Sequence, residues 1–456
     1  RNLLVINTCK LMYKIQSMAE PSSKSTGITA INDLPEHLLL DILSFLPTLD
    51  AIRTSSLSRT WRNLWPSISS LDFDYTLFPP SGSFPVTRQL FADFVNQTLI
   101  LRSDSRLHKF RLRFFFPEPR YYNLVVSWIR YAINHNVGEL DINVEVDSGY
   151  REIEADCYYD FPLSALRINS VRVLRLHSCH LTIPQDRSMC FVSVRSLSLA
   201  EVFLPDRLVS LLISGFSNLE SLVLNDCYGM ENLKIYSLKL KELSLWYFDF
   251  EEDEVSSVEI NAPSLRSLSI IRFEMGKYSL KDCSSLVEAN VDFPYEDYKY
   301  WSKVVRLLTG VKRLTVQNWW FEFLTTKDVS SERFVLNNLN YLELQTGYSE
   351  SDLLGIEALL ELSPNLVTMI LDFVYVMDED ESLPEEFLSR PISLNLPSLR
   401  QVKMKNFRGT DNEFYLLLLL KNQRVVLEKV VVVSEEVGES EISIAALVLE
   451  WTVSNN

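Results

Sequence analysis

The segments LKELSL at Leu240–Leu245 and LRSLSI at Leu265–Ile270 decide the fold of this 456-residue chain. Each places apolar side chains three and then two positions apart, and the two segments follow one another after about 25 residues. Residues two apart in a strand point to the same face of a sheet. Both segments are therefore interpreted as short strands whose apolar side chains point inward.

The same spacing recurs before and after these two segments. The triplets are Leu107/Phe110/Leu112, Val137/Leu140/Ile142, Val171/Leu174/Leu176, Val194/Leu197/Leu199, Leu219/Leu222/Leu224, Leu240/Leu243/Leu245, Leu265/Leu268/Ile270, Leu286/Ala289/Val291, Val311/Leu314/Val316, Leu339/Leu342/Leu344, Leu366/Met369/Leu371, Leu399/Val402/Met404 and Leu427/Val430/Val432. A period of this length is typical of leucine-rich repeats, in which stacked units bury one another's strands. The pattern predicts an α/β fold, a curved leucine-rich-repeat solenoid of parallel strands with short, irregular helices and turns between them.

The chain begins with a helical region. In Ile31–Ser67, Leu34, Leu38, Leu39, Ile42, Leu43 and Leu46 recur at helical spacing, with Asn32 or Asp33 as the expected N-cap. Asp50 is expected to cap a second helix at Ala51–Leu57, and Ser58 a third. Three helices of this size form too small a core to be stable alone, so a partner or the following domain must cover them. Two longer helices are expected at Thr87–Leu101 and Tyr122–Asn134.

The segment Leu34–Trp65, which opens LPEHLLLDILSFLPT and closes LSRTWRNLW, resembles an F-box from end to end. The resemblance implies docking on a Skp-type adaptor and, through it, on a cullin–RING ubiquitin ligase. It implies that the following residues make or support the adaptor contacts: Leu34, Pro35, Leu39, Ile42, Leu43, Leu46, Leu57, Trp61 and Trp65. The alternative is a helical hairpin that packs only on its own downstream domain.

The remaining chain resembles a large plant family of F-box/leucine-rich-repeat proteins. The phrases FVNQTLILR at Phe94–Arg102 and WIRYA at Trp128–Ala132 are similar to the spacer of that family. The end, from Leu396 to Val430, resembles its FBD module, although Gln423-Arg424-Val425 departs from the usual pattern. The expected domains are a disordered tail at 1–29, an F-box at 30–70, a helical spacer at 71–135, leucine-rich repeats at 136–395 and an FBD-like module at 396–456.

Composition excludes several classes of protein. The net charge of −16 disfavours a nucleic-acid partner, and 12 glycines make a Gly-rich phosphate loop unlikely. No apolar run reaches the length of a membrane span. Six cysteines without a CxxC pair predict reduced thiols, and the stretch before Met18, the suspected start, lacks a signal-peptide pattern. We therefore expect a cytoplasmic and/or nuclear protein.

Candidate chemistry is sparse. His177, Cys179, His180 and Cys190 could together suggest zinc, but Cys179 follows Leu176 by three residues as Cys227 follows Leu224. This is the repeat position at which a buried Cys or Asn bonds to neighbouring backbone, so both thiols are predicted to be buried and no metal or other cofactor is expected. No catalytic constellation is found, and the chain is predicted to be a non-catalytic adaptor.

Two functions are weighed. The first is the substrate-recognition subunit of an SCF-type ligase, with an unidentified protein target on the repeats. The alternatives are a hormone-like small-molecule receptor, disfavoured because the basic residues are dispersed, or a non-ligase repeat scaffold. Trp, Tyr and Arg are enriched at binding hot spots. Target contacts are therefore predicted at Trp246, Arg313, Gln317, Tyr341 and Gln345, and not at the acidic runs Glu251–Glu254 and Asp378–Glu381.

Overall fold

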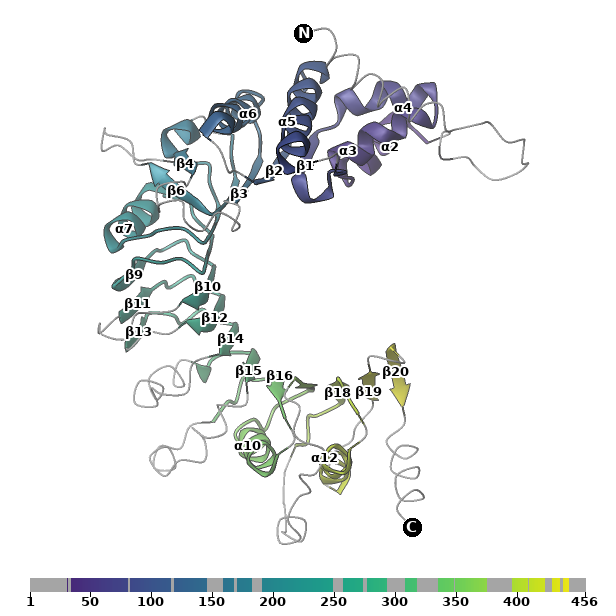
Figure 1. Cartoon of the computed structure of the whole chain (residues 1–456). Coiled ribbons are helices and arrows are strands. Elements are labelled where there is room, and N and C mark those ends of the chain that lie inside the picture. Colours follow the sequence, from purple (N-terminus) through teal and green to yellow (C-terminus); the bar gives the residue numbers. More distant parts are fainter. Residues whose placement is uncertain are drawn as a thin grey trace, which may run out of the picture. The chain divides into compact units, whose positions relative to one another are not determined.

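The structure is a computed structural model (Figure 1) that describes residues 31, 34–80, 83–115, 119–145, 159–167, 170–182, 191–248, 257–273, 277–292, 308–317, 335–347, 349–374, 396–408, 410–422, 429–434 and 438–442. The tail at 1–29, the expected caps Asn32 and Asp33, Cys190 and both acidic runs lie outside these residues. The chain divides into two compact units. Unit 1 comprises Arg1–Leu204 and Leu211–Leu219, and unit 2 comprises Pro205–Ser210 and Glu220–Asn456. Each unit is described by itself.

Unit 1 begins with three short helices, as the sequence predicts, but two of them start elsewhere. They are α2 (Glu36–Ser44), α3 (Thr48–Arg53) and α4 (Arg59–Leu64), with the 3-10 turns η2 (Thr54–Ser56) and η3 (Trp65–Ser67). Pro35 and Pro47 occupy the N-cap positions of α2 and α3, so the expected Ala51–Leu57 helix capped by Asp50 is wrong. Ser58 does cap α4, because its hydroxyl accepts a bond from the Trp61 amide at 3.5 Å.

A parallel sheet follows in unit 1. Its strands are β1 (Ser70–Asp74), β2 (Lys109–Phe115), β3 (Glu139–Glu145), β5 (Val173–His177) and β7 (Ser196–Ala200), paired in that order. The helices α5 (Phe84–Leu101) and α6 (Tyr122–Asn134) confirm both expected long helices. Unit 1 also contains a small parallel pair, β4 (Tyr159–Pro162) with β6 (Cys179–Thr182), and three 3-10 turns, η4 (Tyr75–Leu77), η5 (Pro119–Tyr121) and η7 (Leu163–Arg167). The division between the two units falls within α7 (Asp206–Gly215).

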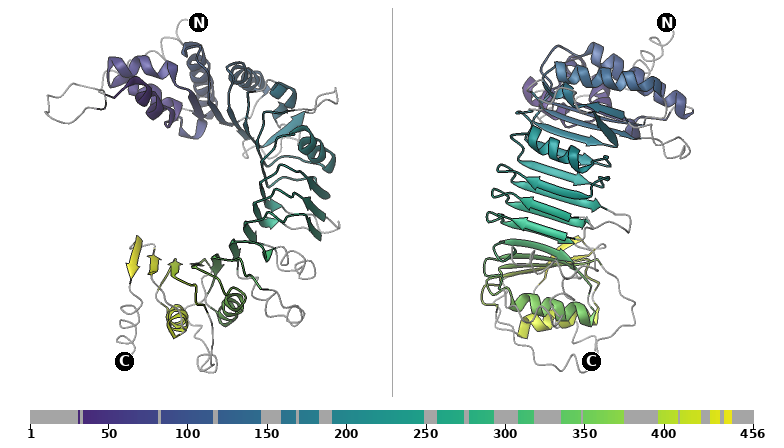
Figure 2. Two further views of the ribbon diagram at one scale, coloured as in Figure 1. Left: turned by 180° about the vertical axis from the view of Figure 1, so that it is seen from behind. Right: turned by 90° about the vertical axis from the view of Figure 1, so that its left-hand side faces the viewer.

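Unit 2 repeats the same geometry. The strands β8 (Ser221–Asn225), β10 (Glu242–Phe248), β12 (Ser267–Phe273), β14 (Glu288–Asp292), β15 (Arg313–Gln317), β16 (Tyr341–Thr346), β17 (Thr368–Phe373), β18 (Gln401–Lys405) and β19 (Lys429–Ser434) are parallel neighbours. The last strand, β20 (Gly438–Ile442), pairs antiparallel with β19. Figure 2 shows α10 (Glu350–Glu361) and α12 (Asp411–Asn422) side by side on one face of the later strands.

The predicted inward triplets form the core of both units. Every member from Leu107 to Met404 is buried, and paired strands keep the triplets in register, as in Leu222↔Leu243↔Leu268. The side chains of the last triplet, at 427, 430 and 432, lie outside the described residues. Buried apolar ladders of this kind are what hold stacked repeats together, since no single repeat can bury its own strand. The predicted fold class, an α/β chain with an N-terminal helical region and a sheet of parallel repeat strands, is confirmed.

The segments between the strands differ from expectation in the middle of unit 2. Instead of irregular helices and turns, β9 (Asn232–Tyr236), β11 (Ser257–Asn261) and β13 (Lys277–Lys281) form a second parallel sheet in the order β13-β11-β9. The physical reason is a period of two: Leu233/Ile235 and Val258/Ile260 each turn two apolar side chains to the same buried face.

Candidate functional site

The nine residues assigned by resemblance to adaptor binding differ in exposure: four are buried, two are half-buried and three are exposed. Leu39, Leu43, Trp61 and Trp65 are buried in unit 1, and Trp61 is only 3% exposed. In the free chain these four side chains therefore build the interior of the helical region. They can support an adaptor-binding surface, but they do not form it. Leu34 and Leu46 are half-buried, whereas Pro35 is exposed.

The exposed apolar side chains of the helical region lie chiefly on α2. Leu38, Ile42 and Phe45 are 40%, 36% and 87% exposed, and Leu57, just after η2, is 67% exposed. Leu38, Ile42 and Phe45 are four and three positions apart, the spacing that brings helical residues to one face. We call Leu38, Ile42, Phe45 and Leu57 the exposed apolar set. The sequence prediction included Ile42 and Leu57 but missed Leu38 and Phe45, although their helical spacing from Ile42 was visible.

Covering water-exposed apolar groups of this size with a partner is favourable, by roughly 25 cal/mol for each Å² of apolar surface removed from water. The opposite side of α2, with Leu39 and Leu43, is fixed by its own core. α2 therefore has two apolar sides, of which one packs against the core of unit 1 and the other is exposed to solvent. An apolar side left open on a helix is a typical feature of a protein interaction surface.

The residues predicted to contact a target lie on the outward face of unit 2, and most have partners within the chain. Trp246 is half-buried, and its indole N–H donates to the Ser269 hydroxyl at 2.9 Å. Gln317 donates to Gln345 at 3.0 Å across the β15–β16 pair. Trp246 is thus held against the next strand and is only partly accessible to a target.

Arg313 and Tyr341 are directly opposite one another in β15 and β16. The Arg313 guanidinium carbon lies 3.7 Å from the centroid of the Tyr341 ring, a cation–π contact, while its Nε faces Glu288 Oε1 at 3.4 Å. The Tyr341 hydroxyl donates to Glu343 at 2.9 Å. Burial, together with this bond to a carboxylate, raises the pKa of Tyr341, so the phenol stays neutral at physiological pH.

The same surface continues across the next two strands, β17 and β18, to Lys405 on β18. Its Nζ lies 2.5 Å from Glu343 and 3.7 Å from Asp372, and Asn406 donates to Asp372 at 2.7 Å. Burial acts to lower the pKa of Lys405, but the hydrogen bond and charge of Glu343 outweigh burial and raise it. The outward face from β14 to β18 therefore carries a network of paired charges whose partners all lie within the chain.

The predicted burial of Cys179 and Cys227 is confirmed, and the Cys227 thiol donates to the Asn225 carbonyl at 3.6 Å. His177 contacts the hydroxyl of Ser178 at 3.1 Å, whereas His180 faces Asp160 at 3.8 Å. Within the ranges that the structure covers, no three His, Cys, Asp or Glu side chains are grouped so as to hold a metal ion. In the same part of the chain, no helix combines the length and hydrophobicity needed to cross a lipid bilayer.

Comparison with known proteins agrees with this arrangement. Residues 31–72 match the F-box domain, and residues 99–432, most of the chain, match the leucine-rich-repeat domain described as At1g61320/AtMIF1, LRR domain. The chain belongs to the F-box/leucine-rich-repeat proteins. An F-box joined to leucine-rich repeats supports the general role of a substrate adaptor. The families matched are not catalytic ones.

Three Arabidopsis thaliana relatives illustrate the similarity of this F-box/leucine-rich-repeat protein to others. The F-box/LRR-repeat protein 13 is 27% identical over 92% of this chain and 93% of its own length. The FBD-associated F-box protein At5g22730 is 27% identical over 89% of this chain and 88% of its own length. The F-box/FBD/LRR-repeat protein At1g80470 is 26% identical over 80% and 78%.

Proposed function

We propose that this chain is the substrate-recognition subunit of an SCF-type cullin–RING ubiquitin ligase. The F-box would bind a Skp-type adaptor, the adaptor would join it to the cullin, and the repeats would present a protein target. The observation that supports this most strongly is the exposed apolar set on a helical region whose other side is packed: Leu38, Ile42, Phe45 and Leu57. A ligase of this kind operates in the cytoplasm or nucleus, and we propose the same location for this chain.

The buried and exposed groups have different roles in this proposal. The exposed apolar set makes the adaptor contacts, with Pro35 and the half-buried Leu34 and Leu46 at its border. Leu39, Leu43, Trp61 and Trp65 hold the helices in position beneath it. Truncating an interface anchor removes affinity without unfolding the protein, whereas truncating a core residue destabilises the fold.

For the target, we propose the outward face of unit 2 that bears Trp246, Arg313, Gln317, Tyr341 and Gln345. The cation–π pair of Arg313 with Tyr341 and the ion pairs around Lys405 fix these side chains in advance. A surface that is ordered before binding loses less conformational entropy when a partner arrives. We also retain the predicted limits of the modules, with the F-box at 30–70, the spacer at 71–135, the repeats at 136–395 and the FBD-like module at 396–456.

The test is whether the chain bridges to a cullin. Purified chain, Skp-type adaptor and cullin are mixed and separated by size-exclusion chromatography. The proposal predicts that the three proteins elute together and that the chain leaves the complex when adaptor is omitted. A triple variant, Leu38→Ala/Ile42→Ala/Phe45→Ala, should elute alone. Ile100→Ala, which alters an equally exposed side chain on α5, is the matched control and should remain in the complex. Elution of the wild-type chain apart from adaptor and cullin would refute the proposal.

A further inference from the structure

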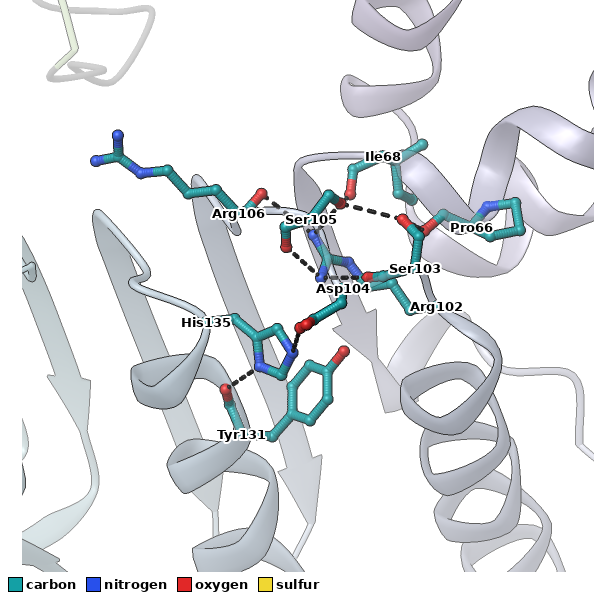
Figure 3. A network of polar contacts seen from close by, with 9 residues as sticks. All are labelled: Pro66, Ile68, Arg102, Ser103, Asp104, Ser105, Arg106, Tyr131 and His135. Atoms are coloured by element: carbon teal, nitrogen blue, oxygen red, sulfur yellow. Dashed lines mark hydrogen bonds and ion pairs between the residues drawn. The ribbon is translucent and has the colours of Figure 1, made fainter.

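Arg102, the residue that follows α5, is a buried arginine at the boundary between the F-box and the repeats. Its side chain is 7% exposed, and the guanidinium donates five hydrogen bonds (Figure 3). Nη1 donates to the carbonyls of Ser103 at 3.2 Å and Ser105 at 2.8 Å. Nη2 donates to the carbonyls of Ile68 and Arg106, both at 3.2 Å, and to the Ser105 hydroxyl at 3.1 Å.

All of these acceptors are neutral oxygen atoms. In the described part of the chain no carboxylate pairs with Arg102, and its Nε is buried without a hydrogen-bond partner. A buried cation without a counter-charge is costly, so the arginine must be held by geometry. The planar guanidinium presents a rigid fork of donors, which can serve carbonyls from two segments at once. A lysine ammonium has only three donors at one point and cannot span them.

The bonds of Arg102 join two segments that are distant in sequence. Ile68 follows the last turn of the F-box, whereas 103–106 leads from α5 into β2. The backbone N–H and the hydroxyl of Ser103 both donate to the Pro66 carbonyl at 2.8 Å, and the His108 amide donates to Ser69 at 2.7 Å. The end of the F-box and the loop before β2 are thus joined by hydrogen bonds at Pro66, Ile68 and Ser69.

A second contact fixes the F-box on the sheet itself. Thr48, the first residue of α3, is fully buried, and its hydroxyl accepts a bond from the Asp72 amide of β1 at 2.7 Å. In the sheet of unit 1, β1 pairs with β2 on one side only, so its other edge would otherwise be open. An open strand edge exposes unpaired backbone groups. The F-box therefore caps the first strand of the repeat sheet.

We propose that Arg102 is a positioning residue, which joins the F-box to β1 and β2 so firmly that an adaptor bound to the F-box also stabilises these strands. This inference rests on the proposed adaptor binding. A ligand that binds only the folded form raises the free energy of opening of every element that opens together with its site. If the two segments held by Arg102 open as one unit, adaptor binding also stabilises the loop at 102–109 and β2, although neither contains a residue of the exposed apolar set.

Hydrogen exchange of the full chain, with and without purified Skp-type adaptor, tests the proposal. In the wild type, saturating adaptor should slow amide exchange in α2 and also in β1, β2 and the loop at 102–109, by about tenfold or more where opening is sub-global. In Arg102→Gln, exchange in α2 should still slow and adaptor affinity should stay within about twofold, but the slowing in β2 and the loop should disappear.

Arg106→Gln is the matched control. Arg106 lies in the same loop, its side chain is exposed, and only its carbonyl takes part in the network (Figure 3). Arg106→Gln should behave as the wild type. Arg102→Lys keeps the positive charge but not the planar guanidinium, so it should lose part of the adaptor-induced slowing of amide exchange in β2. Should Arg102→Gln not fold, the comparison of Arg102→Lys with Arg106→Gln decides the point.

The outcomes separate the two proposals. An adaptor that does not bind the wild type would refute the proposed function itself. An adaptor that binds but slows exchange in the F-box helices alone would leave that function standing and overturn the coupling. Equal slowing of β2 in the wild type and in both Arg102 variants would show that Arg102 is not the residue that joins the two segments.

Discussion

Several non-glycine residues at or near the ends of the repeat strands adopt a left-handed backbone. Asp226, Tyr247 and Arg272 have φ of 50°, 50° and 46°, and they occupy the same place in three successive repeats. The Asp226 amide donates to the Trp246 carbonyl at 2.8 Å, so its backbone N–H stays hydrogen-bonded to the next strand in this conformation. A left-handed conformation costs an ordinary side chain about 1 kcal/mol, and Asn tolerates it best.

The exposed Tyr247 is the clearest site to test this strain. Tyr247→Asn should raise the free energy of unfolding by about 0.5–1 kcal/mol because Asn adopts positive φ more readily. Tyr247→Val at the same position should lower it, since a branched side chain fits this backbone least well. Urea unfolding of the two variants measures the difference. Equal stability of Asn and Val variants would show that the backbone here is not strained.

Two acidic residues on β3 should respond to pH with opposite signs. Burial raises the pKa of Glu139, but the hydrogen bonds and charges of Lys109 and Arg175 outweigh burial and hold it below its usual value. Glu139 therefore contributes stability that is full above its unfolded pKa of about 4.3 and is lost as pH falls through the lower folded value. The stability difference between wild type and Glu139→Gln, about 1 kcal/mol at neutral pH, should shrink on acidification.

Asp141 is the counterpart on the same strand. Burial raises its pKa although Arg111 lies 3.8 Å away. The contribution of Asp141 to the free energy of unfolding is therefore full below its unfolded pKa of about 3.9, and it is lost as pH rises through the higher folded pKa. Relative to the wild type, Asp141→Asn should become more stable as pH rises from about 3 to 7, the reverse of Glu139→Gln. Urea unfolding of the three proteins across this range checks both signs, and parallel pH profiles would contradict them.

Among the elements, α12 depends on a buried acid. The Glu413 carboxylate is fully buried and accepts bonds from the amides of Thr410 at 2.7 Å and Arg408 at 3.2 Å. Glu413→Ala leaves these partly buried N–H groups without their acceptor, which should cost about 1–2 kcal/mol. Hydrogen exchange should show α12 and β18 opening more readily. Glu350→Ala, at the exposed start of α10, is the control and should change little. An effect of Glu413→Ala no larger than that of Glu350→Ala would show that the cap does not hold α12.

The elements also show how far the sequence could be interpreted. The strands of the main sheet that carry a triplet were predictable from its inward pattern, and α6 was found at Tyr122–Asn134 from one apolar face. The two end strands β1 and β20 carry no triplet and were not predicted. The second sheet was not predictable, because only Leu233 and Ile235 indicate a strand at β9, and β9 pairs with β11 only once the repeats are stacked. Nor could the sequence show which apolar side chains in and just after α2 are buried. Leu39 and Leu43 are buried, whereas Leu38 and Phe45 are exposed. Which side of an apolar helix is covered depends on its neighbours.

At the scale of the whole molecule, we propose that the F-box both binds the adaptor and covers the first strand of the repeat sheet. The target surface on unit 2 and the exposed apolar set are separate groups of residues, so each should be removable alone. Once a target is known, the Arg313→Ala/Tyr341→Ala variant should bind it about tenfold or more weakly than the wild type does. The same variant should bind the adaptor with wild-type affinity. Affinity measurements on both partners check this separation, and loss of adaptor binding in this variant would contradict it.

The most direct measurement is a calorimetric titration of the purified full-length chain with a Skp-type adaptor. The account predicts one adaptor per chain, a dissociation constant of about 1 μM or below, and a negative heat-capacity change from burial of the exposed apolar set. Phe45→Ala should weaken binding by about tenfold or more while the thermal unfolding midpoint stays unchanged. Absence of heat and of complex for the wild-type chain at micromolar concentrations, or full affinity in the Leu38→Ala/Ile42→Ala/Phe45→Ala variant, would contradict the account.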